Sequence, residues 1–361
     1  MELKLGIPYM GCKRKLSKRI VDRILEDNPN TKYVYDLFGG GGAISFELLQ
    51  RPQIERVIYN ELNTGVTELL KDIRDNGVTE KYYQWIDRET FNANKNKDDW
   101  FGGLCKCIWS FGNSQKAYLF GREIEEYKRL FHQLVVNGVD TTKEMSSFCE
   151  DYVFNKYGIK QELNLTIPIK EDYQERRFEI RSQLNIFEKS CKLSQLRNLQ
   201  QLEQLERLQQ LQQLQQLQQL EIQNKSFEDV IINTPVNETI IYLDPPYLNT
   251  AKYEKDVDQK LLNDYINNSP YKIYLSSYDC GLRCIEEYKH NSSLATGKNN
   301  QVVEKLFIKE PNDGYNYLPE NYNERISRVT VKNIKLERCK CGGKIKGKYC
   351  EDCLEEVVNN S

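Results

Sequence analysis

The sequence predicts an α/β fold, a doubly wound Rossmann-like sheet interrupted by an insertion. Residues 33–35 form a short strand pattern that runs directly into a glycine turn at 39–42. A second strand pattern at 57–59 ends beside Glu61, and a third apolar run at 240–243 ends in a proline-containing loop. A strand, a glycine turn, a helix and a strand ending in an acid are the opening pattern of a doubly wound sheet.

The first part of this core is expected at residues 1–92. Apolar residues recur four apart over 16–24 and mark one face of a helix that ends near residues 28–29. Residues 43–49 resume helical patterning after the glycine turn, and a further helix is expected after the second strand, through Ile73. These segments supply the first two strand–helix units of the sheet.

Residues 93–190 break the alternation of strands and helices, and we interpret them as an insertion. They combine scattered basic residues with many aromatic residues and show little clear periodicity. The aromatic residues include Trp100, Phe101, Trp109, Phe111, Tyr118 and Phe120.

A low-complexity tract at residues 191–219 carries leucine at every third position, from Leu193 to Leu220. An α-helix repeats after about 3.6 residues, so each successive leucine would step ~60° backwards around it. The tract lacks the heptads of a coiled coil. A helix with a winding apolar stripe and a tract that merely tolerates changes of length both remain open.

The second part of the core is expected at residues 220–335, where alternating α/β patterning resumes. Its strands are expected at 220–222, 240–243, 272–275, 302–308 and 328–331. The last two of these are expected to complete the sheet.

The composition argues against a membrane protein and against a secreted disulfide scaffold. No run of ~18 apolar residues is present, and no charged-then-apolar leader opens the chain. The 11 cysteines are an odd number in a chain without an export signal. A cytoplasmic protein without membrane contact is therefore expected.

Positive charge gathers at both ends of a chain whose formal net charge is −2. The first 25 residues hold seven Lys or Arg against two acids, and residues 325–348 hold nine against one. Two basic ends favour an anionic partner such as nucleic acid. Solvated helix and tail faces are the alternative, and charge alone does not decide between them.

The strongest chemical signal is Asp244-Pro245-Pro246-Tyr247, at the end of the 240–243 strand. Proline has no backbone N–H, so the loop offers carbonyl acceptors, and the aspartate adds another. Such acceptors suit a planar amino group, while the tyrosine offers a flat face for stacking a base. A proline-stiffened turn that caps a strand is the plain alternative.

The glycine turn at residues 36–42 allows a ligand to approach the backbone closely. Glycine turns are common, and this one lacks the usual dinucleotide spacing. Glu61, at the end of the next strand, is placed to accept hydrogen bonds from two ribose hydroxyls. An exposed acid at a strand end is the alternative for Glu61.

These motifs together resemble the Dam-type (alpha-group) DNA adenine-N6 methyltransferases, particularly the phage and mobile-element branch. The resemblance covers about residues 5 to 310. The matching segments, in order, are Gly6–Lys13, Asp36–Gly42, Asn60–Asn63 and Asp244–Tyr247. Residues 109–113 and 118–121 and the leucine tract are also similar to that branch.

The resemblance implies S-adenosylmethionine as cofactor. The positions that match the cofactor site of the family are Tyr9, Lys13, Asp36, Phe38, Gly40, Gly42, Glu61 and Asp244. Many members have Asp where this chain has Glu61, a change that keeps the acceptor. Many also carry an acid before an aromatic on the third strand, where this chain has Ser226-Phe227. Contacts of Phe227 with the cofactor's adenine are therefore less defined.

The resemblance also implies methyl transfer to a flipped-out adenine of double-stranded DNA, with Asp244, Pro245, Pro246 and Tyr247 as the catalytic loop. The insertion would be the target-recognition region, supplying base contacts and wedges. An RNA adenine or a protein amide as acceptor, or a silent DNA-binding module, are the rival functions. The recognition sequence, a restriction endonuclease partner and the oligomeric state are not decided by the sequence.

The tail at residues 336–361 has the spacing of a four-thiolate zinc ribbon. Cys339 and Cys341 form one close pair, and Cys350 and Cys353 form the other, with glycines between the pairs. So short a tail has no core of its own, so structural zinc would have to fold it. Unligated thiols are the alternative.

Overall fold

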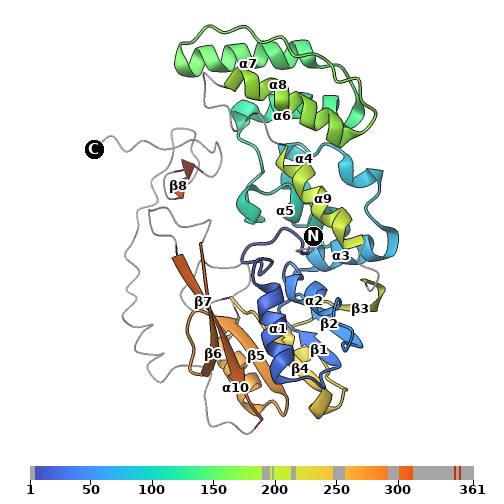
Figure 1. Cartoon of the computed structure of the whole chain (residues 1–361), viewed down its shortest axis with the longest axis vertical. Coiled ribbons are helices and arrows are strands. Elements are labelled where there is room, and N and C mark those ends of the chain that lie inside the picture. The colour runs from blue at the N-terminus through green and yellow to red at the C-terminus, as the bar shows by residue number, and fades with distance from the viewer. Residues whose placement is uncertain are drawn as a thin grey trace, which may run out of the picture. The chain divides into compact units, whose positions relative to one another are not determined.

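The computed structural model describes residues 5–188, 196, 199–212, 217–246, 257–291, 301–311, 345–346 and 349–350. The chain divides into two compact units (Figure 1). The first comprises Met1–Val78, Asn96–Cys107 and Arg207–Ile334, and the second comprises Thr79–Lys95, Ile108–Glu206 and Lys335–Ser361. No helix within the described ranges is long and apolar enough to cross a membrane.

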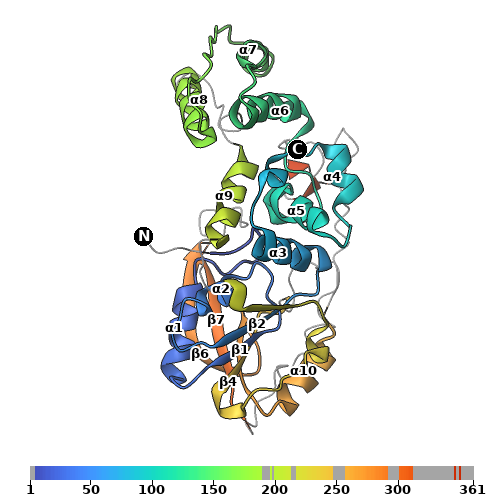
Figure 2. The same cartoon turned by 90° about the vertical axis from the view of Figure 1, so that its right-hand side faces the viewer.

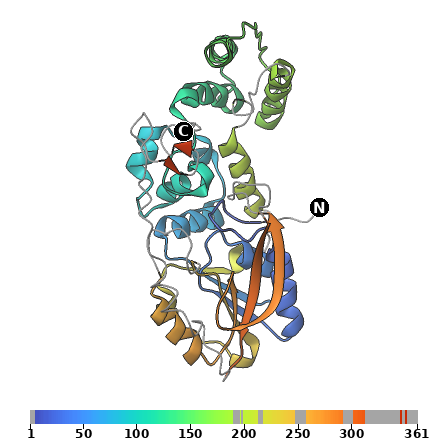
Figure 3. The ribbon, with the colours of Figure 1, turned by 90° about the vertical axis from the view of Figure 1, so that its left-hand side faces the viewer.

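The first unit has the α/β architecture that the sequence predicted, and its sheet contains both parallel and antiparallel strands. Its described strands are β1 (Tyr33–Asp36), β2 (Arg56–Asn60), β3 (Leu220–Gln223), β4 (Thr239–Leu243), β5 (Lys272–Ser277), β6 (Arg283–Asn291) and β7 (Gln301–Lys309). Their order across the sheet is β3-β2-β1-β4-β5-β7-β6. The first five are mutually parallel, and β7 runs antiparallel between β5 and β6. Figure 3 shows β6 and β7 as long neighbouring strands. The sequence did not predict β6.

The strand register brings the ends of three strands together. Asp36, the last residue of β1, lies between Tyr59 of β2 and Tyr242 of β4. The order of strands along the chain reverses at β1, because β2 and β4 flank it. In open parallel sheets, ligands bind outside the carboxyl ends of the strands at this switch point.

Helices cover both faces of the sheet (Figure 2). The helices of the first unit are α1 (Ser17–Asp27), α2 (Ala43–Leu48), α3 (Thr64–Asn76) and α10 (Gln259–Asn268). Ile241 of β4 lies opposite Ile273 of β5, and both pack with Leu262 and Ile266 of α10 in one apolar core. Successive residues of a strand point to opposite faces of the sheet. Tyr274, the residue after Ile273, therefore points to the opposite face, where its hydroxyl contacts Asn28 at the end of α1.

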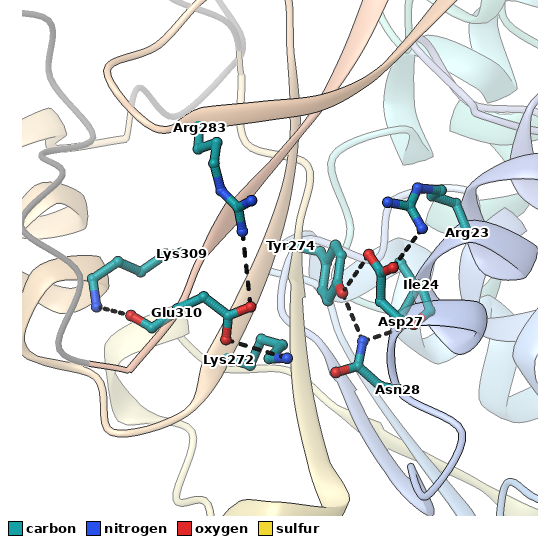
Figure 4. A network of polar contacts seen from close by, with 9 residues as sticks. All are labelled: Arg23, Ile24, Asp27, Asn28, Lys272, Tyr274, Arg283, Lys309 and Glu310. Carbon is teal, nitrogen blue, oxygen red and sulfur yellow. Dashed lines mark hydrogen bonds and ion pairs between the residues drawn. The ribbon is translucent and has the colours of Figure 1, made fainter.

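Polar contacts fasten α1 and the last strands to the sheet (Figure 4). The Tyr274 hydroxyl accepts a hydrogen bond of 2.6 Å from Asn28 and donates to Asp27 at 3.4 Å. The Glu310 carboxylate lies 3.2 Å from the Lys272 ammonium and 4.0 Å from the Arg283 guanidinium. Side chains from β5 and β6 thereby meet the residue that follows β7.

Helix α5 (Trp100–Ile108) lies almost wholly in the first unit, although the sequence had placed residues 93–190 in one insertion. Two glycines bring α3 and α5 into backbone contact, since a Cβ on Gly103 would lie 1.9 Å from the Gly65 carbonyl oxygen. This contact depends on two glycines that are 38 residues apart in sequence, so no short motif marks the boundary.

The described part of the second unit that precedes the tail is mostly helical, whereas its sequence shows little clear periodicity. Its helices include α4 (Arg88–Asn94), α6 (Arg122–Asn137), α7 (Thr142–Tyr157) and α8 (Tyr173–Glu188). Helix α6 contacts both α7 and α8. Its buried residues Ile124, Tyr127, Phe131 and Leu134 recur three or four apart, a helical stripe that the aromatic-rich composition concealed.

The aromatic residues expected to contact bases are largely core residues instead. Trp109, Tyr118 and Phe120 are buried and pack around one another. Trp85 stacks on Phe120, with 5.8 Å between ring centroids, and also contacts His132. Burial lowers the pKa of His132 to about 4, so this imidazole is neutral near pH 7. These rings therefore stabilise the unit and do not serve as wedges.

The leucine tract forms a helix over part of its length. Helix α9 covers Gln200–Gln212, and Leu199, Leu202, Leu205 and Leu208 are all fully buried. Steps of ~60° between successive leucines spread them over about half of the helix circumference. Of the two alternatives, this segment is the helix with a winding apolar stripe.

The remaining predicted elements fall mostly outside the described residues. These include the strand expected at 328–331 and the side chains of Cys339, Cys341 and Cys353. In the tail, β8 (Ile345–Lys346) pairs antiparallel with β9 (Tyr349–Cys350). Cys350 is described by its backbone alone. Short 3₁₀ segments occur at Glu80–Tyr83, Phe111–Asn113, Leu217–Gln219, Phe227–Asp229 and Val236–Glu238.

Candidate active site

The glycine turn connects β1 to α2 and depends on the residues beneath it. Gly40 and Gly42 have φ angles of +49° and +71°, which side chains rarely adopt. The ring of Tyr59 lies under Gly39, where an added Cβ would come within 2.2 Å of Tyr59 Cε2. The Tyr59 hydroxyl donates to the Gly40 carbonyl at 2.7 Å. The sequence singled out Gly40 and Gly42, but neither Gly39 nor Tyr59.

Glu61 is buried at the end of β2, so it is not the exposed strand-end acid of the plain alternative. Its carboxylate accepts hydrogen bonds from the backbone N–H groups of Gly40, at 2.9 Å, and Asn63, at 2.8 Å. Burial raises the pKa of Glu61, and the hydrogen bonds from Asn63 and Gly40 counteract that rise. One carboxylate thus ties the glycine turn to the start of α3.

Asp36 contributes a buried acceptor to the same place. Ser45 of α2 donates a hydrogen bond of 2.7 Å to Asp36 Oδ2, while Oδ1 is buried without a hydrogen-bond partner among the described residues. Burial raises the pKa of Asp36 to about 7, and the negative charges of Asp244 and Glu61 add to the rise. A buried acceptor without a partner is costly, so a donor or a cation bound there would be favoured.

The segment before α1 packs on the glycine turn. The Ile7 N–H donates to the Gly41 carbonyl at 2.8 Å. The Tyr9 side chain hydrogen-bonds with Glu61, and a Cβ on Gly40 would lie 3.3 Å from Tyr9 Cε1. Tyr9, Gly40 and Glu61, which the sequence predicted as cofactor residues, therefore lie together.

Lys13 lies at the Asp-Pro-Pro loop. Its ammonium donates to Asp244 Oδ1 at 2.9 Å, across 231 residues of sequence. It also lies 3.6 Å from Glu304 Oε1, an acid on β7 that the sequence had not singled out. The Lys13 side chain is only 8% exposed. The structure thus joins a predicted cofactor residue to a predicted catalytic residue.

Phe38 and Phe227 are neighbours, with ring centroids 5.3 Å apart. Phe227 is buried and also meets Tyr265 of α10 edge-on at 5.4 Å. Phe38 is only partly buried and packs against the same core. Among the remaining predicted catalytic residues, Pro245 and Pro246 follow β4 directly, and Tyr247 lies outside the described residues.

Asn60 holds the backbone around these groups, and the sequence gave it no separate role. It is buried, and its amide donates to the Leu37 and Lys225 carbonyls, both at 3.1 Å. Its Oδ1 accepts from the Lys225 N–H at 3.0 Å. An amide can make these three bonds at once because it carries both donors and an acceptor. No sequence pattern distinguishes such an asparagine from a surface one.

The charges of the site favour a cationic ligand. Four acids (Asp36, Glu61, Asp244 and Glu304) face one cation, Lys13, among the residues described above. Burial makes such an excess of negative charge costly unless a positive group offsets it. Within the described part of the chain, no cluster of three or more His, Cys, Asp or Glu residues could hold a metal ion.

The chain matches the family of D12 class N6 adenine-specific DNA methyltransferases over residues 9–307, and it belongs to that family. It is therefore an adenine-specific DNA methyltransferase, a family that uses S-adenosylmethionine. The mixed α/β architecture with its seven-strand sheet fits the methyltransferase fold. No curated protein matches the chain closely.

Asn60→Ala is expected to destabilise the protein by about 2–4 kcal/mol, because buried groups at Leu37 and Lys225 lose their partners. Urea unfolding followed by circular dichroism measures this change. Asn76→Ala, at an exposed helix end, is the control and should cost less than about 1 kcal/mol. Equal unfolding midpoints for the two variants would contradict the assignment.

Proposed function

We propose that the crevice at the ends of β1, β2 and β4 is where this enzyme binds S-adenosylmethionine and the target adenine. The observation that carries the proposal is the contact of Lys13 with Asp244 beside the glycine turn. Asp36 supports it, because Asp244 contributes to the raised pKa of Asp36 and so lies close to it. The cofactor residues and the acceptor loop therefore share one site.

The chain's own residues fit the cofactor. When bound, S-adenosylmethionine supplies a methyl group on a positively charged sulfonium. The unpartnered Asp36 Oδ1 and the excess of acids suit a cationic ligand. Glu61 would accept from the ribose hydroxyls, and Tyr9, Phe38 and Phe227 would line the remaining cofactor surface.

The acceptor side uses the Asp-Pro-Pro-Tyr loop. Asp244 and the Pro245 carbonyl would accept the two N–H bonds of the adenine amino group and orient its lone pair. Pro246 stiffens the loop, and Tyr247 would stack on the flipped base. A strong general base is unnecessary, since the proton can leave once the nitrogen has become cationic.

The second unit is proposed to recognise the DNA target. Phe111 is 41% exposed on a loop closed by the bridge between Ser110 and Tyr118. Asn113 and Gln115 of this loop have positive φ angles, so its backbone is held in an unusual conformation.

At the start of α1, Lys15 and Lys18 are exposed and would meet phosphate.

We also propose membership of the phage and mobile-element branch, a restriction endonuclease partner and a zinc-binding tail. For the tail, the four cysteines 339, 341, 350 and 353 would enclose one ion. The short β8–β9 hairpin follows the first pair in sequence and ends at Cys350, the first cysteine of the second pair.

Asp244→Ala is expected to lower methyl transfer to unmethylated double-stranded DNA by about 10³-fold or more, because the amino group loses its charged acceptor. Transfer of tritiated methyl groups measures this loss, with RNA as a parallel substrate. The exposed Asp229→Ala is the matched control and should retain full activity. Normal transfer by Asp244→Ala would remove its assigned role.

Cofactor affinity should rise about tenfold between pH 6 and pH 8. Asp36, whose pKa is about 7, is mostly protonated at the lower pH and ionised at the higher, and the ionised form attracts the sulfonium. Calorimetry at constant ionic strength measures this dependence.

Asp36→Asn should bind the cofactor weakly, with an affinity that does not change with pH. Ser45→Ala should move the rise to higher pH, since it removes a hydrogen bond that lowers the pKa of Asp36. A flat wild-type profile would refute the idea.

Metal analysis of the purified full chain should return about one zinc per chain. Replacing Cys339 and Cys341 together by Ser should abolish the bound metal, because two thiolates cannot complete a tetrahedral site. Replacing Cys105, which is buried in the first unit, is the control and should leave the zinc content unchanged. A metal-free wild-type protein would exclude the ribbon.

A further inference from the structure

Glu304 is a buried acid that no motif assigns to the reaction. It lies on β7 and is 3% exposed. Strand β7 runs antiparallel to β5, with Lys305 opposite Ser277. The residue before Lys305 therefore lies at the edge of the sheet where β4 and β5 end, which is the edge that carries Asp244.

The Lys13 ammonium is shared by two carboxylates. It lies 2.9 Å from Asp244 Oδ1 and 3.6 Å from Glu304 Oε1. The Asp244 side chain is 19% exposed and the Glu304 side chain is 4% exposed. Asp244 is thus the more accessible acid of the pair, and Glu304 lies on the buried side.

The charges of Glu304, Asp244 and Lys13 also affect the pKa of Tyr278, the residue directly after β5. Burial raises the pKa of Tyr278, the charges of Glu304 and Asp244 raise it further, and Lys13 lowers it. Because charge effects weaken with distance, these groups form one compact cluster at the end of β4 and β5.

The carboxylate of Glu304 changes the electrostatic environment of Asp244 through the Lys13 ammonium that both contact. A lysine paired with Asp244 alone would offset most of its negative charge, which would weaken it as an acceptor for the adenine amino group. A second acid on the same ammonium divides that positive charge. Burying this extra acid costs free energy, and a purely structural lysine pair would not require it.

We infer that Glu304 is a positioning residue for methyl transfer, which holds Lys13 on its buried side and so keeps Asp244 oriented and negatively charged toward the target amino group. The inference rests on the proposed role of Asp244. In this role Glu304 acts through Lys13 and Asp244.

The test replaces Glu304 by Asp and by Gln and measures steady-state methylation of unmethylated DNA. The kcat should decrease in the order Glu, Asp, Gln, by about threefold for Glu304→Asp and about tenfold for Glu304→Gln, because the contact acts mainly in the transition state. The KM values for DNA and for S-adenosylmethionine should stay within about threefold of wild type. Thermal unfolding of each variant reports whether it is folded.

A double-mutant cycle shows whether Glu304 acts through Lys13. In a Lys13→Met background, Glu304→Gln should cause no further loss of kcat. Glu286→Gln, an acid on β6 that pairs with Arg23 of α1, is the matched control and should keep kcat within about twofold.

Three outcomes would each overturn the inference. The first is a wild-type kcat in folded Glu304→Gln, and the second is a change confined to KM. The third is a loss of kcat on adding Glu304→Gln to Lys13→Met that equals the loss in the wild-type background. Should Glu304→Gln fail to fold, Glu304→Asp decides, and its wild-type kcat would be equally decisive. If Asp244→Ala keeps full activity, the proposed function fails together with this role. An inactive Asp244→Ala beside a fully active Glu304→Gln removes the role alone.

Discussion

The parallel pairing of β1 with both β2 and β4 is the constraint on which the candidate active site depends. It aligns Asp36 with Tyr59 and Tyr242, so the loops after three strands open at one edge. The glycine turn and the Asp-Pro-Pro loop, distant in sequence, therefore meet without any local signal. The N-terminal segment contacts both loops. The Ile7 N–H donates to the Gly41 carbonyl, and Lys13 donates to Asp244.

The groups at this edge of the sheet are held by a second layer of buried polar residues. Tyr59 supports the turn from below, Asn60 ties the loop after β1 to the loop after β3, and Ser45 fixes one oxygen of Asp36. Each such contact satisfies a buried group that would otherwise be costly. The other Asp36 oxygen has no such contact among the described residues, which leaves an acceptor for a ligand.

Much of the core could be predicted from the sequence, because apolar strands and the glycine turn are local patterns. The β6 strand and the helical second unit were missed. Aromatic composition suggested surface contacts at Trp109 and Tyr118, which tertiary packing buries instead. In the candidate site, Glu61 and Asp244 could be proposed from the sequence because they belong to short motifs. Glu304 was not, because its position depends on an antiparallel strand pairing that no short motif records.

The ends of β2 and β3, which are far apart in sequence, are held side by side. Asn60 pairs with Gln223 in the sheet, and Asn224 donates to the carbonyl of Glu61, 163 residues away in sequence. Closing a long loop costs only slightly more than closing a shorter one. A change in the length of the stretch between these anchors would therefore cost little free energy of loop closure and would leave the paired strand ends in place.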